Sequence, residues 1–278
     1  MLKDEDWSGK GVLSMKLRVG KIPYANLFPI FYMIEKQGGG DRYDIIEGVP
    51  SELNRKLRDN IIDISPSSSI EHLRHPDRYE VIRNHSISAD GSIKSILLFS
   101  KTPLDSLNGQ TILTSSQSET SVALVKIICR KFYNLACVFA PSADPIGKAL
   151  GSHQAYMLIG DDAIRESHKW PDLHVYDLGS LWKQHTGLPF TYALWLVRKE
   201  CAAEAPEDLS GFFRDLDTAK KLSQTGLREA AAAWPHKTML PQEDLIAYWQ
   251  GISYDLTDEH WKSLSLFRQY AVELGLIP

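Results

Sequence analysis

Short apolar runs alternate with helical patterns along most of the chain, and this alternation constrains the fold more than any other feature. Parallel strands need a crossover connection, usually a helix, so strand–helix alternation favours mostly parallel sheets that are covered by helices. After about Pro206 the strand patterns stop and only helical patterns follow. The sequence therefore predicts an α/β body followed by a helical tail.

Two expected strands, 94–100 and 191–197, bracket a middle segment with its own strand–helix alternation. We expect the chain to cross there twice between two lobes, and a length of 278 residues is typical of a protein with two lobes. The predicted division is an N-terminal extension at 1–14, a first lobe formed by 15–98 and 196–278, and a second lobe at 99–195. The other strands are expected at 17–20, 43–48, 62–65, 79–83, 111–114, 137–140, 155–160 and 174–178, and helices at 27–37, 51–59, 119–133, 144–151, 207–233, 242–250 and 257–274.

Composition limits the partners that this chain can have. Hydrophobic residues make up 43% of the sequence and charged residues 24%, so the chain can bury a substantial core and is not expected to be disordered. The net charge of -4 argues against a nucleic acid or an anionic membrane as a partner, because both bind basic surfaces. Local groups must therefore hold any anionic ligand.

The cysteines and the apolar runs indicate the compartment. Cys129, Cys137 and Cys201 are odd in number and form no CxxC motif, so we expect neither a disulfide framework nor a zinc site. No apolar run approaches the roughly 18 residues that a membrane span requires, and the polar start lacks the apolar region of a secretory signal. We expect a cytoplasmic protein without a membrane partner, either a monomer or a homodimer.

The common cofactor and catalytic motifs are missing from the sequence. It has neither the GxxxxGK[ST] phosphate loop nor the GxGxxG dinucleotide motif, and its nine histidines are scattered without an HExxH. No GxSxG motif marks a nucleophilic serine. These observations disfavour hydride transfer, metal-dependent hydrolysis and covalent acyl transfer. We expect a site that needs no metal and no cofactor.

A hydroxyl-rich stretch at 114–128 is a candidate anion site. It reads as a strand end, a loop and an amphipathic helix, with Ser118, Thr120 and Ser121 at the helix start. The N–H groups of a first helical turn lack partners and carry a partial positive charge, so they can bind a carboxylate. Alternatively, one of these hydroxyls only caps the helix. The sequence leaves both interpretations open.

Two further stretches place hydroxyls near strand ends. Ser67, Ser68 and Ser69 lead from an expected strand into a helix, and Ser95 follows a turn that contains a glycine. Open α/β sheets bind ligands beyond the carboxyl ends of their strands, so these serines can face the same cleft as the first cluster. Helix capping and turn formation are the alternatives.

Acidic and aromatic residues follow or occupy two other strands. Asp161 and Asp162 stand at a strand-to-helix junction, where both can favour the helix dipole. Alternatively, Asp161 acts as a base or orients a neighbouring group. Tyr192 and Trp195 belong to an aromatic strand, and we expect them in the core rather than in the wall of a ligand site.

Seven segments, taken in order and spacing, resemble the chorismate dehydratases of the futalosine route to menaquinone. The resemblance runs from about Leu17 to the C-terminus. It implies the periplasmic-binding-protein type II fold, in which two α/β lobes are joined by two crossing strands and enclose a ligand cleft. It also implies conversion of chorismate to 3-[(1-carboxyvinyl)oxy]benzoate with loss of water. The segments are KIPYANLFPIFY, EGVPSELNRKL, IDISPSSSIEHL, ISADGSIKSILLFS, SQSETSVALVKII, LIGDDAI and YDLGSLWKQHTGLPFTYALW.

The first of these segments departs from the family at three positions. It keeps the family's tyrosine and asparagine as Tyr24 and Asn26. It has Lys21, Pro23 and Ala25 where the family has arginine, serine and leucine. Lysine keeps the charge of arginine but lacks its bidentate fork, so it would grip a carboxylate less specifically. These departures bear on substrate geometry more than on the class of reaction.

The resemblance implies roles for the candidate residues. Asn26 is expected to hold the leaving hydroxyl or an adjacent carboxylate, and the substrate's own enolpyruvyl carboxylate is the expected proton acceptor. Asp161 is the less favoured base. The expected substrate-binding residues are Lys21, Tyr24, Ser67, Ser68, Ser69, Ser95, Ser118, Thr120 and Ser121.

Two alternatives to a chorismate dehydratase remain open from the sequence. One is the sister enzyme of the same pathway, which makes 1,4-dihydroxy-6-naphthoate on the same fold. The other is a non-catalytic protein that captures a small carboxylate by closing its lobes. The missing export signal argues against the second alternative.

Overall fold

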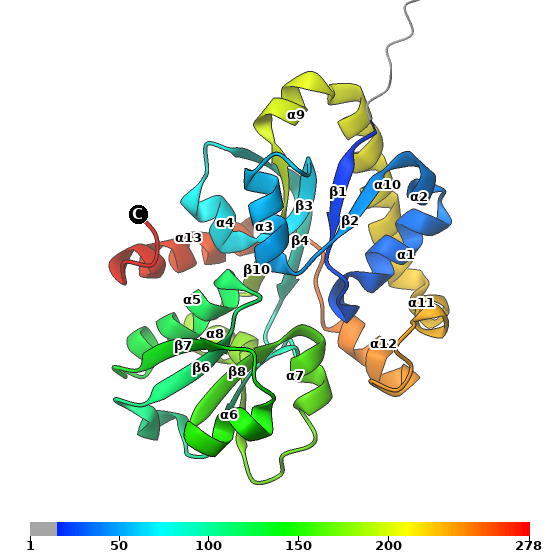
Figure 1. The fold of residues 1–278 in the computed structure, drawn as a ribbon. Coiled ribbons are helices and arrows are strands. Elements are labelled where there is room, and N and C mark those ends of the chain that lie inside the picture. Colours follow the sequence, from blue (N-terminus) through cyan, green and yellow to red (C-terminus); the bar gives the residue numbers. More distant parts are fainter. Residues whose placement is uncertain (1–15) are drawn as a thin grey trace, which may run out of the picture.

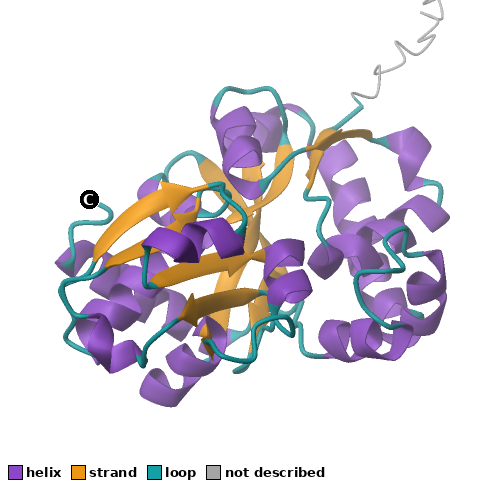
Figure 2. Ribbon diagram, turned by 60° about the horizontal axis from the view of Figure 1, so that its bottom comes forward, coloured by secondary structure: helices purple, strands orange, loops and turns teal. Residues whose placement is uncertain are grey.

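The computed structural model describes residues 16–278 as two α/β lobes, each built on a five-stranded sheet (Figures 1 and 2). The expected extension at 1–14 lies outside the described residues. The strands are β1 (Arg18–Lys21), β2 (Asp44–Glu47), β3 (Ile64–Ser68), β4 (Tyr79–Ala89), β5 (Ile96–Ser100), β6 (Thr111–Ser115), β7 (Val138–Ser142), β8 (Ala155–Ile159), β9 (His174–Asp177) and β10 (Phe190–Arg198).

The two sheets share one topology. Their strand orders are β2-β1-β3-β10-β4 and β7-β6-β8-β5-β9. In each sheet the first three strands pair in parallel, and the two pairings that follow are antiparallel. The sheets are therefore mixed. Each sheet has a parallel part, and the carboxyl ends of such strands are where open α/β sheets form ligand clefts.

Helices pack on both sheets, and the C-terminal tail joins the lobes. In the first lobe α1 contacts α10 and α3 contacts β3, while the last helix, α13, contacts both β10 and α5 (Figure 1). The helix expected at 207–233 is divided at Gly226, whose backbone leaves the helical conformation with φ -100° and ψ 17°. The helices are α1 (Phe28–Lys36), α2 (Gly39–Arg42), α3 (Pro50–Arg58), α4 (Ser69–Arg74), α5 (Glu119–Ile127), α6 (Ile146–Ser152), α7 (Gly160–Glu166), α8 (Leu178–Thr186), α9 (Lys199–Glu204), α10 (Pro206–Thr225), α11 (Leu227–Ala233), α12 (Gln242–Gln250) and α13 (Asp258–Glu273), with 3-10 turns η1 (Ala25–Leu27) and η2 (Leu104–Leu107) and a π-helical turn η3 (Ile128–Phe132).

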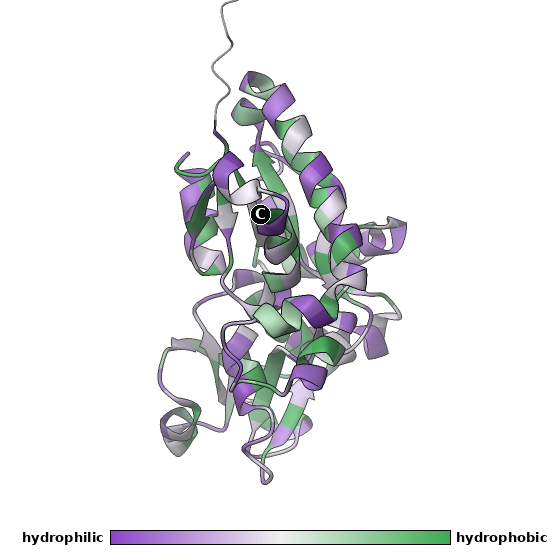
Figure 3. Cartoon of the chain, turned by 90° about the vertical axis from the view of Figure 1, so that its right-hand side faces the viewer, coloured by the Kyte–Doolittle hydropathy of each residue, from purple (hydrophilic) through white to green (hydrophobic). Residues whose placement is uncertain are grey.

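The second sheet is buried on both faces. Along β5, Ile96 and Leu98 belong to the main apolar core, whereas Leu97 and Phe99 belong to a second apolar cluster. Successive side chains of a strand point to opposite faces, so a continuous apolar run requires cover on both sides. The main core continues through the first lobe. The helices that provide the cover carry both hydrophilic and hydrophobic residues along their length (Figure 3).

The chain passes between the lobes after β4 and returns before β10. These two strands pair from Phe190 and Ala89 at one end to Arg198 and Tyr79 at the other. The predicted lobe boundaries at 98/99 and 195/196 fall inside β5 and β10, of which β5 belongs to the second sheet and β10 to the first. The assignment of residues to lobes at these numbers remains a prediction.

Two strands are longer than the sequence predicted. The strands expected at 62–65 and 79–83 end at Ser68 and Ala89, because both β3 and β4 pair with β10 beyond their expected ends. The serines expected in a loop after β3 therefore lie largely in the sheet. No helix among residues 16–278 is long and apolar enough to cross a membrane.

A buried ion-pair cluster ties three strands of the first sheet together. Asp63, directly before β3, has a side chain that is 1% exposed. Its Oδ1 accepts hydrogen bonds from Arg18 Nη2 at 2.6 Å and from Arg198 Nη2 at 2.8 Å. Burial by itself raises the pKa of Asp63, but the two guanidinium donors outweigh burial and hold the pKa below its usual value.

Candidate functional site

A cavity lies between the lobes at the carboxyl ends of the parallel strands. The space that protein atoms leave free in it, together with the open solvent at its mouth, is about 560 Å³. Residues that follow β1 and end β3 line it from the first lobe, and residues that follow β6 and end β8 line it from the second. This is the position at which open α/β sheets bind ligands.

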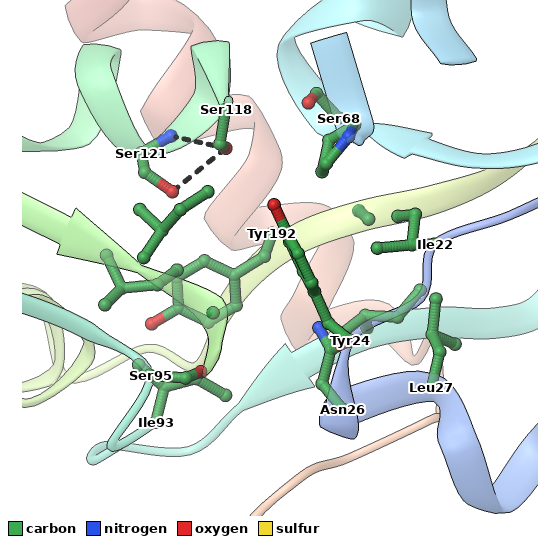
Figure 4. Close-up of a pocket in the computed structure, with 16 residues that line it drawn as sticks. Ile22, Tyr24, Asn26, Leu27, Ser68, Ile93, Ser95, Ser118, Ser121 and Tyr192 are labelled. Atoms are coloured by element: carbon green, nitrogen blue, oxygen red, sulfur yellow. Dashed lines mark hydrogen bonds between the residues drawn. The ribbon is translucent and has the colours of Figure 1, made fainter. Parts of the chain in front are cut away.

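Six of the residues predicted from the sequence line this cavity. Figure 4 shows the side chain of Tyr24 across its middle, with Asn26 at the foot of the same loop and the Ser118–Ser121 pair on the opposite side. The six residues are Tyr24, Asn26, Ser68, Ser95, Ser118 and Ser121.

The start of α5 combines a helix cap with a cavity wall. Ser118 is the N-cap, because its extended backbone precedes the helix and its Oγ accepts the Ser121 N–H at 3.4 Å. The Ser118 and Ser121 hydroxyl oxygens lie 3.0 Å apart, and both residues line the cavity. Ser118 therefore caps the helix. The same arrangement also presents the two hydroxyls and the positive end of the helix dipole to the cavity, so both interpretations of this stretch apply.

Other predicted hydroxyls are buried behind the cavity wall. The Ser69 and Thr120 hydroxyl oxygens lie 3.3 Å apart, and Thr120 also accepts the Ile70 N–H at 3.1 Å. These contacts join α4 of the first lobe to α5 of the second. The Ser67 hydroxyl is buried and has no hydrogen-bond partner among residues 16–278. None of these three hydroxyl residues belongs to the cavity lining.

The structure does not bring Lys21 to the cavity. Its Nζ lies 2.9 Å from Glu35 of α1 and 3.3 Å from Glu47 at the end of β2, so these two carboxylates neutralise its charge. The adjacent residue, Ile22, points the other way and lines the cavity, as expected from the alternation of side chains along an extended chain. A role for Lys21 in binding substrate remains a prediction.

The Tyr24 side chain is fixed against the second lobe. Its hydroxyl donates a hydrogen bond to Gln117 Oε1, and burial raises the pKa of the phenol. Its ring packs on Gly160, where an added Cβ would lie 3.0 Å from the ring. Gly160 also has a φ of +58°, which side chains with a Cβ rarely adopt. The glycine at the start of α7 therefore suits the close approach of Tyr24.

The backbone of the Tyr24–Asn26 loop is held from three directions. The indole Nε1 of Trp249 donates to the Ala25 carbonyl at 2.7 Å, and the Tyr254 hydroxyl donates to the Asn26 carbonyl at 2.6 Å. The Ala25 N–H donates to Asp161 Oδ1 at 2.9 Å. The side-chain Oδ1 of Asn26 is buried and has no hydrogen-bond partner among the described residues. The loop thus presents a free amide oxygen on a fixed backbone.

Asp161 lies beside the cavity without lining it. Burial raises the pKa of its carboxyl group, while the hydrogen bond from Ala25 opposes that shift. Its neighbour Asp162 instead pairs with Arg165 at 2.7 Å on the surface. The predicted base is therefore in contact with the Tyr24–Asn26 loop but is not part of the cavity wall.

An apolar wall and one tyrosine of the cavity were not predicted as site residues. Tyr192 is buried in the main apolar core, as expected, but it also lines the cavity, and its hydroxyl has no hydrogen-bond partner among residues 16–278. Trp195, in contrast, is buried in the core at 1% exposure. No local signal separates a core isoleucine from one that faces a cavity. The apolar wall comprises Ile22, Leu27, Ile87, Ile93, Ile96 and Ile159.

The cavity offers neutral hydrogen-bond donors and no cationic side chain. No lysine, arginine or histidine belongs to its lining. Within residues 16–278, no group of three or more histidine, cysteine, aspartate or glutamate side chains is arranged to hold a metal ion. The arrangement can bind a carboxylate through hydroxyls and helix N–H groups while an apolar ring packs on the isoleucines.

Comparisons with known proteins agree with this description. The model of the menaquinone biosynthesis family matches residues 17–273. A chorismate dehydratase from Thermus thermophilus is 29% identical over 199 residues, which are 64% of this chain and 68% of that protein. A chorismate dehydratase from Campylobacter jejuni is 28% identical over 178 residues, which are 63% of this chain and 64% of that protein.

Solved structures show the same fold at low sequence identity. Protein AF1704 from Archaeoglobus fulgidus superposes with a TM-score of 0.76 at 20% identity and covers 94% of this chain and 98% of its own. The periplasmic aliphatic sulphonate binding protein SsuA from Escherichia coli superposes with a TM-score of 0.66 at 14% identity, over 95% of this chain and 88% of its own. The predicted periplasmic-binding-protein fold is confirmed. The chain belongs to the menaquinone biosynthesis family, whose model spans nearly all of the described residues.

Proposed function

We propose that the protein is a chorismate dehydratase, a hydro-lyase that converts chorismate to 3-[(1-carboxyvinyl)oxy]benzoate and water without a cofactor. The observation that carries the proposal is the cavity between the lobes. It combines the apolar wall with the capped start of α5 and the unpartnered amide oxygen of Asn26. The two chorismate dehydratases to which the chain is similar support the choice of substrate.

Chorismate is a dianion that carries a cyclohexadiene ring, and its two parts suit the two halves of the cavity. One carboxylate accepts hydrogen bonds from the hydroxyls of Ser118 and Ser121 and from the first-turn N–H groups of α5. Each hydrogen bond to a charged group contributes about 1.5–3 kcal/mol. The ring packs against the apolar wall. Ser68 and Ser95 offer further hydroxyls for hydrogen bonds to the substrate.

The reaction requires removal of a ring proton and departure of a hydroxyl group. No aspartate, glutamate, histidine or lysine lines the cavity, so the wall supplies no carboxylate, imidazole or amine base. The substrate's enolpyruvyl carboxylate accepts the ring proton, the C–H electron pair forms a ring double bond, and the C–O bond breaks. The hydroxyl leaves as water with that proton, and aromatisation drives the step. Asp161 remains the less favoured base, because its carboxylate already accepts the Ala25 N–H.

Asn26 orients the leaving hydroxyl in this scheme. Its free Oδ1 accepts a hydrogen bond from the leaving hydroxyl, which keeps its proton, and its Nδ2 donates a hydrogen bond to a neighbouring oxygen of the substrate. The backbone contacts of its loop hold the amide in place before the substrate arrives. A pre-positioned polar group of this kind lowers the barrier because it needs no reorganisation during the reaction.

Incubation with chorismate, followed by proton NMR, tests the proposal. We expect aromatic proton signals of the product to replace the diene signals of chorismate, and we expect Asn26→Ala to lose most of this turnover. Chorismate that binds but remains unchanged would identify a binding protein. Chorismate that does not bind, together with turnover of the substrate of the naphthoate-forming sister enzyme, would identify that enzyme. Wild-type turnover in Asn26→Ala would contradict the role of Asn26.

A further inference from the structure

We infer that Asp161 is a positioning residue that latches the Tyr24–Asn26 loop to the second lobe and thereby fixes Asn26. The catalytic part of this inference rests on the proposed function. The latch is the hydrogen bond from the Ala25 N–H to Asp161 Oδ1, which is 2.9 Å long and crosses the cleft between the lobes.

The loop has two kinds of backbone contact. Trp249 and Tyr254 belong to the C-terminal tail and hold the carbonyls of Ala25 and Asn26 at 2.7 Å and 2.6 Å. Asp161 belongs to α7 of the second lobe and accepts the Ala25 N–H, which precedes both carbonyls in the chain. The loop is therefore held both by the C-terminal tail and by the second lobe, and the Asp161 hydrogen bond is the contact that ties its backbone to α7.

A second contact at the start of α7 supports the docking of the loop. Gly160, the residue before Asp161, lies so close to the Tyr24 ring that an added Cβ would be 3.0 Å from it. The helix start therefore offers a flat backbone surface to the ring and a carboxylate to the next N–H. Gly160 and Asp161 of one lobe thus contact Tyr24 and Ala25 of the other. The two paired contacts define how the loop aligns with the start of α7.

The consequence for catalysis follows from the side chain of Asn26. Its Oδ1 has no hydrogen-bond partner among the described residues, so no hydrogen bond to that oxygen holds the amide, and its position depends on that of the loop backbone. A misplacement of about 1 Å can lower a rate by a hundredfold. Loss of the latch should therefore lower kcat through the position of Asn26. Asp161 itself does not line the cavity.

Two variants of Asp161 separate a latch from a base. In Asp161→Asn the amide oxygen still accepts the Ala25 N–H but cannot take a proton, so we expect kcat within roughly fivefold of wild type, as for exchange of a charged acceptor for a neutral one. In Asp161→Ala the acceptor is lost, and we expect kcat to fall by roughly 10- to 150-fold, as for loss of a hydrogen bond to a charged group.

The opposite results would overturn the inference. A base contributes roughly 10²- to 10⁴-fold, so equally large losses in the asparagine and alanine variants would identify Asp161 as the base. Wild-type kcat in Asp161→Ala would exclude a positioning role. Asp162→Ala is the matched control, because Asp162 is on the same helical turn, is 53% exposed and pairs with Arg165. We expect its kcat to be that of wild type.

Amide hydrogen exchange at Ala25 tests the latch without chorismate. We expect slow exchange in wild type, Asp161→Asn and Asp162→Ala, and faster exchange in Asp161→Ala after its folding has been checked by circular dichroism. Equal exchange in all four proteins would overturn the latch. If exchange behaves as expected but chorismate is not turned over, the proposed function fails and the latch stands.

Discussion

The substitution Ser118→Asp tests where the substrate carboxylate binds. Ser118 caps α5 through the Ser121 N–H and lines the cavity with the same side chain. Aspartate is as good an N-cap as serine, so the helix should persist. A negative charge at a helix N-terminus adds about 0.3–1 kcal/mol of stability. The variant should therefore be as stable as wild type or slightly more stable.

The same charge should oppose a carboxylate bound at the start of α5. Two like unit charges about 4 Å apart repel by roughly 4 kcal/mol at an effective dielectric constant of about 20. Ser118 is partly exposed, and solvent screens the repulsion there, so we take about half of that energy as the lower bound. A loss of roughly 2–4 kcal/mol corresponds to a rise in Kd of roughly 30- to 700-fold.

Initial-rate kinetics with chorismate and thermal denaturation measure the two effects. Ser118→Asn is the matched control, because asparagine also caps helices and adds similar volume without charge. We expect a large rise in KM for Ser118→Asp and a small change for Ser118→Asn, at similar Tm. Equal KM values for the two variants would refute the placement of a carboxylate at α5.

Three other substitutions test contacts that position the site and the sheet. Tyr254→Phe removes the donor to the Asn26 carbonyl, so kcat in initial-rate assays should fall by roughly tenfold, as for loss of one buried hydrogen bond; an unchanged kcat would contradict this. Gly160→Ala places a Cβ 3.0 Å from the Tyr24 ring at a φ of +58°, so denaturant titration should show a loss of about 1–2 kcal/mol, and wild-type stability would contradict the close contact. Asp63→Asn should lower the free energy of unfolding by about 3 kcal/mol at pH 7. Because the folded pKa of Asp63 is lowered, its contribution is present above the unfolded pKa of about 3.9 and is lost as the pH falls through the folded pKa; an equal difference at pH 7 and pH 3 would refute the pairing.

Local patterns predicted the fold because they are repeated along the chain. The apolar run of β5 and the aromatic run of β10 marked the two crossings, and the hydroxyls before α5 marked the start of a helix. The ends of β3 and β4 were not predictable in this way. They depend on pairing with β10, which lies more than 100 residues further along the chain.

The site was predictable only in part, because orientation decides which hydroxyls face the cavity. Thr120 and Ser121 are adjacent, but one turns toward α4 and the other lines the cavity, as the rotation of about 100° per helical residue requires. The contacts of Trp249 and Tyr254 with the Ala25–Asn26 backbone span 224 and 228 residues, so no local pattern could reveal them.

A crystal structure with bound 3-[(1-carboxyvinyl)oxy]benzoate would test the location of the reaction most directly. We predict one product carboxylate at about 3 Å from the hydroxyl oxygen of Ser118 or Ser121, the benzoate ring against the apolar wall, and the Asn26 amide directed at the product. Product bound instead in the second-lobe groove beside Arg165 and Trp170, or in the cavity with neither carboxylate at α5, would contradict the proposed site.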